Sequence, residues 1–143
     1  MAQDSVVKEQ LTEAMIRAGA ELTRKLDELR WPVLASLWLY LSEGNQWKLV
    51  LASPLVASDG PKKSYEMVQA ALATTPAAER TVALSDVGVT DLENPLIELL
   101  RVAVKTGPTV GGIRFTRNVN NGHFIEDAYI YRMSDTAPNG QAT

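Results

Sequence analysis

The sequence predicts one α+β domain with a largely antiparallel sheet, built from two β-hairpins, a short strand and three helices. The expected order of elements is α-ββ-α-β-α-ββ. Two observations carry this prediction: helical spacing of apolar residues in three segments, and two pairs of β-favouring runs, each interrupted by a turn signal. A length of 143 residues suits a single domain with a single core. We expect this domain to span residues 1–133 and the polar segment 134–143 to be a disordered tail.

The first helix is indicated by apolar residues that recur every three or four positions from Val7 to Leu29. Asp4 or Ser5 is suited to cap its start. Pro32 ends it, because the residue before a proline avoids helical backbone angles. In its middle, Gly19 lies between two alanines and offers a flat spot where another backbone can approach closely.

The first hairpin is predicted from two β-favouring runs that flank the turn cluster of residues 42–45. Strand alternation gives two apolar faces. One face holds Leu37, Leu39, Val50 and Ala52, and the other holds Trp38, Tyr40, Trp47, Leu49 and Leu51. We therefore expect either that other parts of the chain cover both faces or that a partner closes one of them.

Prolines place the remaining helices. Pro61 and Pro95 each fit the first position of a helix, and the first of these helices ends before Pro76. We expect the second to end near residues 106–108, with Gly107 as its C-terminal cap. Between the hairpins, residues 53–60 are expected to form a loop and residues 81–84 a short strand.

The second hairpin is predicted around Asn121-Gly122, the dipeptide best suited to a type I′ turn. This turn places Asn120 opposite His123 and sets the whole register. One face is expected to be core, and it holds Ile113, Phe115, Val119, Phe124, Ala128 and Ile130. The other is expected to be a semi-polar surface, and it holds Arg114, Thr116, Ile125, Asp127, Tyr129 and Tyr131.

Composition limits the classes of function. The net charge of −3, without a basic cluster, argues against a nucleic acid as the main ligand. The chain has no cysteine, which excludes disulfides and cysteine zinc sites and suits a reducing compartment. The apolar run 33–41 is too short to span a bilayer, and the N-terminus lacks a signal-peptide pattern. We expect a cytoplasmic protein without a membrane segment, cofactor or metal.

The polar residues do not form a recognisable catalytic motif. Glu126 and Asp127 are neighbours on a strand and point to opposite faces, so they cannot easily act as a carboxylate pair or chelate one metal. A hydrolase or nuclease therefore requires that the fold bring separate polar side chains together in a cleft. The candidates are Asp86, Asp91, Arg114, His123, Glu126 and Asp127.

Aromatic residues suggest a different function. Seven of the nine lie in the two hairpins, a surplus over what one small core is expected to cover, and tyrosine and tryptophan are enriched at protein interfaces. The leading hypothesis is therefore a non-catalytic interaction or regulatory module that acts as a homodimer or with a protein partner. Its candidate contact residues are Trp38, Tyr40, Trp47, Arg114, Tyr129 and Tyr131. The alternative is a small-molecule sensor with a pocket between sheet and helices, lined by Trp38, Tyr40, Arg114 and Tyr129.

Overall fold

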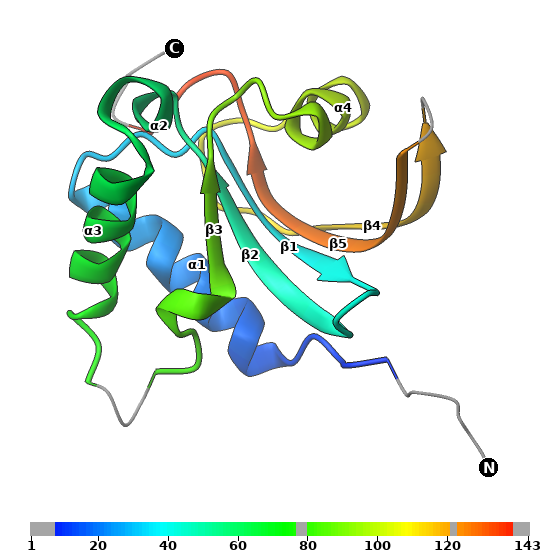
Figure 1. Cartoon of the computed structure of the whole chain (residues 1–143), viewed down its shortest axis with the longest axis horizontal. Coiled ribbons are helices and arrows are strands. Elements are labelled where there is room, and N and C mark those ends of the chain that lie inside the picture. The colour runs from blue at the N-terminus through cyan, green and yellow to red at the C-terminus, as the bar shows by residue number, and fades with distance from the viewer. Residues whose placement is uncertain (1–7, 77–79, 121–122, 139–143) are drawn as a thin grey trace.

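The structure, a computed structural model, describes residues 8–76, 80–120 and 123–138. In this part of the chain one mixed five-stranded sheet has the strand order β3-β2-β1-β5-β4, so the predicted α+β class is confirmed. Figure 1 shows helices on both sides of the sheet. The elements are α1 (Glu13–Glu28), β1 (Ala35–Leu41), β2 (Gln46–Ala52), α2 (Pro54–Asp59), α3 (Pro61–Leu72), the 3₁₀ helix η2 (Leu84–Asp86), β3 (Val87–Thr90), α4 (Pro95–Ala103), β4 (Ile113–Asn120) and β5 (His123–Met133).

Helix α1 begins later than its apolar periodicity suggests. Its N-cap is Thr12, whose Oγ1 accepts a hydrogen bond from the backbone N–H of Met15 at 3.1 Å. The predicted caps, Asp4 and Ser5, lie outside the described residues. Residues 8–12 are not helical, and they cross the aromatic side of the sheet before α1 starts. The helix ends at Glu28, and Arg30 then adopts a positive φ of 63°.

The β1–β2 hairpin has the predicted turn and faces. Trp38 pairs with Leu49 and Leu39 pairs with Lys48, which leaves residues 42–45 as the turn. The side of the sheet that carries Trp38, Tyr40 and Trp47 packs against α1 and α3. The opposite side, which carries Leu37 and Ala52, packs against α4. Elements of the same chain therefore lie over both faces.

Three predictions between the hairpins were wrong. Residues 53–60 are not simply a loop: Ser53 caps α2 by accepting a hydrogen bond from the N–H of Leu55 at 3.1 Å, with Pro54 at the first helical turn. Residues 81–84 are not a strand. The strand is β3, which pairs in parallel with β2 after the crossover through α2 and α3. Gly107 does not cap α4, because the chain leaves the helix at Val104 in an extended conformation.

The β4–β5 hairpin has the predicted register, with Ile113 opposite Ile130, Arg114 opposite Tyr129 and Asn120 opposite His123. The turn at residues 121–122 lies outside the described residues. The predicted faces need correction. Tyr131 is only 1% exposed, so its face is covered by α1 instead of forming a semi-polar surface. Ile113, which was expected in the core, is 39% exposed.

The end of β5 is bound to the rest of the fold. The N–H of Ser134 donates to the carbonyl of Leu34 at 2.8 Å, and Ala137 is buried. Residues 134–138 thus extend the ordered domain beyond the boundary expected at residue 133. Residues 139–143, the rest of the predicted tail, lie outside the described part of the chain.

Candidate interaction surface

The two faces of the sheet are covered to different extents. On the aromatic side, α1 and α3 bury Trp38, Leu49 and Leu51 to 1% exposure or less. On the other side, the nine residues of α4 cover only part of the face. Leu39 and Val50 there remain half-buried although both are apolar and lie on inner strands. An apolar part of the sheet is therefore accessible beside α4.

A groove lies at this incompletely covered end, between α4 and the tip of the β1–β2 hairpin. Its volume is about 450 Å³. Leu96 of α4 forms one wall, Leu39 and Leu41 of β1 form the floor, and Ile125 of β5 closes the far side. The turn at residues 42–44 supplies the polar rim, with Glu43 among its residues. We call this cavity the α4 groove.

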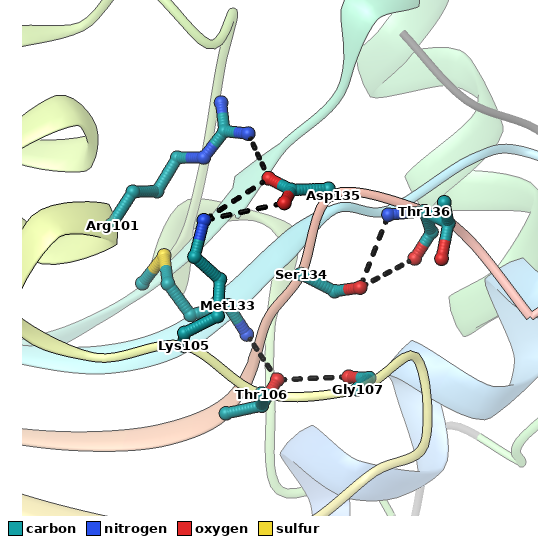
Figure 2. Close-up of polar contacts among 8 residues, drawn as sticks. All are labelled: Arg101, Lys105, Thr106, Gly107, Met133, Ser134, Asp135 and Thr136. Atoms are coloured by element: carbon teal, nitrogen blue, oxygen red, sulfur yellow. Dashed lines mark hydrogen bonds and ion pairs between the residues drawn. The ribbon is translucent and has the colours of Figure 1, made fainter.

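Helix α4 is held in place from its C-terminal end. Figure 2 shows Arg101 and Lys105 converging on Asp135, with Nη2 of Arg101 at 2.5 Å and Nζ of Lys105 at 3.2 Å from its carboxylate oxygens. Below them, Oγ1 of Thr106 accepts a hydrogen bond from the N–H of Met133 at 2.8 Å. The hydrogen bonds from Arg101 and Lys105 lower the pKa of Asp135. These contacts fix α4 to the end of β5.

The N-terminal end of α4 is set by its own cap. The side chain of Asn94 accepts hydrogen bonds from the N–H groups of Leu96, at 2.8 Å, and Ile97. The outward face of the helix is exposed, and Val102 there is 84% accessible. We call the groove together with exposed Pro95, Glu98 and Val102 the α4 surface.

Four of the six contact residues predicted from the sequence lie in the core. Trp38, Tyr40, Trp47 and Tyr131 are each 8% exposed or less. The indole N–H of Trp38 and the phenol of Tyr131 are engaged with the backbone of α1. The aromatic surplus is thus packed beneath α1 and residues 8–12 of the same chain, and these four side chains do not form an exposed contact surface.

The remaining two, Arg114 and Tyr129, lie at the edge of that aromatic face. Arg114 forms a bidentate ion pair with Asp127, with both N–O distances at 2.6 Å. Lys8 adds a third contact to Asp127 at 2.7 Å. Burial by itself would raise the pKa of Asp127, but the hydrogen bonds and charges of Arg114 and Lys8 together lower it. The hydrogen bond to Asp127 also raises the pKa of Arg114.

A cavity of about 330 Å³ lies beside this ion cluster, and Lys8, Trp47, Arg114 and Asp127 contribute to its lining. It differs from the predicted sensor pocket, since Trp38 is buried away from it. Arg114 and Asp127 do converge, as an enzyme would require, but a carboxylate held ionised by two cations is a weak proton acceptor. The cluster is suited to fixing residues 8–12 on the sheet.

The other polar candidates are dispersed. Asp86 accepts a hydrogen bond from the N–H of Ala83, and Asp91 accepts one from the N–H of Glu93, both at 2.9 Å. Glu126 is half-buried on β5. The side chain of His123 lies outside the described residues. Over the described ranges, no group of three or more histidine, cysteine or acidic side chains could hold a metal ion.

No family model, no curated protein and no solved structure matches this chain. Among the helices of residues 8–76, 80–120 and 123–138, none combines the length and apolar character needed to cross a bilayer.

The α4 surface was not predicted from the sequence, although part of its signal is visible there. Val102 follows Glu98 by four positions and so lies on the polar side of α4, at odds with the amphipathic pattern. A valine on an otherwise polar helix face is a reason to look for a contact. The groove itself had no such signal, because Leu39 and Leu96 read as ordinary core residues.

Proposed function

We propose that this protein is a non-catalytic interaction module that forms a homodimer through the α4 surface. The observation that carries the proposal is the incomplete cover of one apolar sheet face. Half-buried Leu39 and Leu96 line an open groove, beside a helix whose Val102 is 84% exposed. Accessible apolar surface is typical of protein contacts in many soluble proteins.

The charges of α4 favour a second copy as the partner. The exposed Glu98 lies nearer its N-terminal end, and Arg101 and Lys105 lie at and just beyond its C-terminal end. Both cations contact Asp135, and this cluster of two cations and one carboxylate keeps a net positive charge. Two copies related by a two-fold axis with antiparallel α4 helices would bring Glu98 of each copy opposite this cluster of the other. The same arrangement brings Val102 of each copy toward the groove end of the other helix. Because the chain has no cysteine, the proposal places this dimer in a reducing cytoplasm.

The homodimer is tested by native mass spectrometry and by light scattering over a range of protein concentrations. We expect a dimer in the unmodified chain and a monomer in Val102→Glu, which places a charge in the contact without disturbing the core. The matched control is Ala70→Glu, at an exposed position of α3 on the opposite side of the sheet. A monomer at about 100 µM in the unmodified chain would remove the homodimer proposal.

The cysteine-free sequence allows a direct map of the contact. A single Val102→Cys variant should give a covalent dimer at low protein concentration when treated with a bismaleimide long enough to reach along the antiparallel helices from one position 102 to the other. An Ala70→Cys variant should remain monomeric on a denaturing gel. Equal cross-linking of both variants would show that collisions, and not the α4 surface, bring the copies together.

A further inference from the structure

A third cavity lies on the side of the sheet opposite the α4 groove, between α1, α3 and residues 80–82. Its volume is about 350 Å³. We propose that this cavity, the α1–α3 cleft, binds a small amphipathic anion: an organic molecule with one carboxylate or sulfonate group on a compact apolar body. The cleft shares no residue with the α4 surface, so this site is independent of the proposed dimer.

The cleft exists because the two helices present small residues to each other. Ala14 and Ala18 of α1 and Ala71 of α3 end at Cβ and leave the space between the helices unfilled. Beneath them, Leu22 and Val82 are buried and form an apolar floor. An apolar group that entered would displace water from this floor, which is the main source of affinity in small-molecule sites.

The rim of the cleft is positively charged. Arg17, Lys25 and Arg80 contribute to its lining, and among the described residues Glu21 is the one carboxylate against them. Nε of Arg80 donates to the carbonyl oxygen of Thr75 at 2.9 Å, which holds the guanidinium at the rim. The same bond satisfies a carbonyl just beyond the C-terminal end of α3, where the helix dipole would otherwise oppose an anion.

The other two cations have weak partners outside the cleft. Arg17 lies 4.0 Å from Glu13, and both side chains are largely exposed. Lys25 lies 3.2 Å from Glu28, also near the surface. Exposed ion pairs of this kind contribute little, so an anion in the cleft can compete for both cations. The mouth of the cleft therefore selects for negative charge.

The size and charge of the cleft define the class of ligand. About 350 Å³ lies near the lower end of the usual range for ligand pockets, roughly 300 to 1,000 Å³, which suits a body of one or two rings. A polyphosphate fits poorly, because the cleft meets the C-terminal end of α3, where the helix dipole opposes several negative charges. Glu21 also disfavours a second negative charge. A ligand with one anionic group and an apolar body therefore matches the residues that line the cleft.

The test uses anilinonaphthalene sulfonate, an aromatic monoanion whose fluorescence rises in apolar surroundings. We expect saturable binding to the full chain and amide NMR shifts clustered on α1, α3 and residues 80–82. Arg80→Gln should weaken binding by about fivefold. Ala14→Leu, which fills the cleft from α1, should weaken it by about tenfold or more. Both variants should keep the cooperative melting of the unmodified chain.

Matched controls separate the cleft from other sites. Lys63→Gln removes an exposed cation from α3 outside the cleft, and Ala70→Leu enlarges an exposed residue of the same helix. Both controls and Val102→Glu should change the dissociation constant by less than about twofold. The proposal is overturned if Lys63→Gln weakens binding as much as Arg80→Gln does. It is also overturned by NMR shifts that cluster on the α4 groove, or by no binding below about 1 mM.

Discussion

The indole N–H of Trp38 donates to the phenol oxygen of Tyr131 at 3.0 Å, although the two residues are 93 positions apart in the chain. The phenol in turn donates to the carbonyl oxygen of Ile16 at 2.5 Å. These bonds join the adjacent strands β1 and β5 to the N-terminal half of α1. Gly19 faces the pair, and a Cβ there would clash with the phenol oxygen and the indole nitrogen. The glycine of α1 thus accommodates two aromatic side chains, where close approach of a backbone was expected.

Gly19→Ala should therefore destabilise the protein, although alanine favours helix. The two rings are buried and hydrogen-bonded, so they cannot move aside without loss of those contacts. We expect the free energy of unfolding in urea to fall by about 1–3 kcal/mol. The control is Gly107→Ala, because nothing lies within 4 Å of a Cβ at that position. A Gly19→Ala variant as stable as the unmodified chain would contradict this packing.

The buried pair of Asp27 and Arg132 gives a second prediction. Arg132 is fully buried, and its two terminal nitrogens donate to Asp27 at 3.0 and 2.8 Å. Asp27→Asn leaves the buried cation without its counter-charge and should lower the free energy of unfolding by about 3–5 kcal/mol. The control is Glu66→Gln, at an exposed carboxylate, which should change the free energy of unfolding little.

The double variant Asp27→Leu, Arg132→Met should recover most of that loss, since apolar side chains need no counter-charge. Nε of Arg132 has no hydrogen-bond partner among the described residues, which adds to the cost of burying this arginine. Urea denaturation of all three variants, followed by circular dichroism, measures these changes. A double variant that is less stable than Asp27→Asn would contradict this expectation, because the ion pair would then stabilise the fold more than apolar side chains do at the same positions.

Acid should weaken the cluster at Asp127. Its pKa in the folded protein lies below the ordinary value near 4, so the folded state binds fewer protons than the unfolded state in this range. The stabilisation is present above about pH 4 and is lost as the pH falls through the lowered pKa. Asp127→Asn should be less stable at neutral pH and should lose part of the acid dependence. Urea midpoints measured between pH 7 and about 2 provide the test.

Asp135 provides the comparison in a test of salt dependence, because the pKa of its carboxyl is lowered by the same kind of contact at an exposed position. In about 1 M NaCl, where the Debye length is about 3 Å, the effect of Asp135→Asn on the midpoint should disappear. The effect of Asp127→Asn should largely persist, since that carboxylate is buried. Equal screening of the two would mean that Asp127 is more accessible than its packing indicates.

Alkaline pH should act through Tyr131. Burial raises the pKa of its phenol well above the usual value near 10, although the hydrogen bond from Trp38 opposes this shift. The stabilisation is complete below about pH 10 and is lost as the pH rises, because the unfolded state then releases its phenolic proton first. In a spectrophotometric titration, one tyrosine should ionise only when the protein unfolds. Tyr131→Phe should abolish this late step, and a late step that remains would assign it to another tyrosine.

The local features of the fold were the predictable ones. The registers of both hairpins follow from alternation and from turn residues such as Asn121-Gly122, which act over a few positions. Strand β3 was missed because residues 81–84 look more like a strand than Val87–Thr90, which contains Gly88. Val82 is nevertheless buried, so its apolar side chain correctly indicated a core position although residues 81–84 do not form a strand.

The candidate site depends on longer-range facts. Whether Trp38 and Tyr131 are buried or exposed depends on where α1 packs. The spacing of apolar residues in a helix does not indicate which face of the sheet that helix covers. Likewise the α4 groove exists because a nine-residue helix covers only part of the opposite face. How far a helix reaches over a sheet follows from its length and anchoring, here at Asp135, and not from the residues it leaves accessible.

The strand order also has a consequence for how the chain is made. Central strand β1 pairs on one side with its neighbour β2 and on the other with β5, which ends at Met133. During synthesis, β1 therefore emerges long before its second partner, and Leu37 and Trp38 stay without their final cover. Folding must wait for a late, long-range closure, which is slow and leaves the growing chain prone to association with other chains. A chain released before residue 123 would keep that open edge permanently.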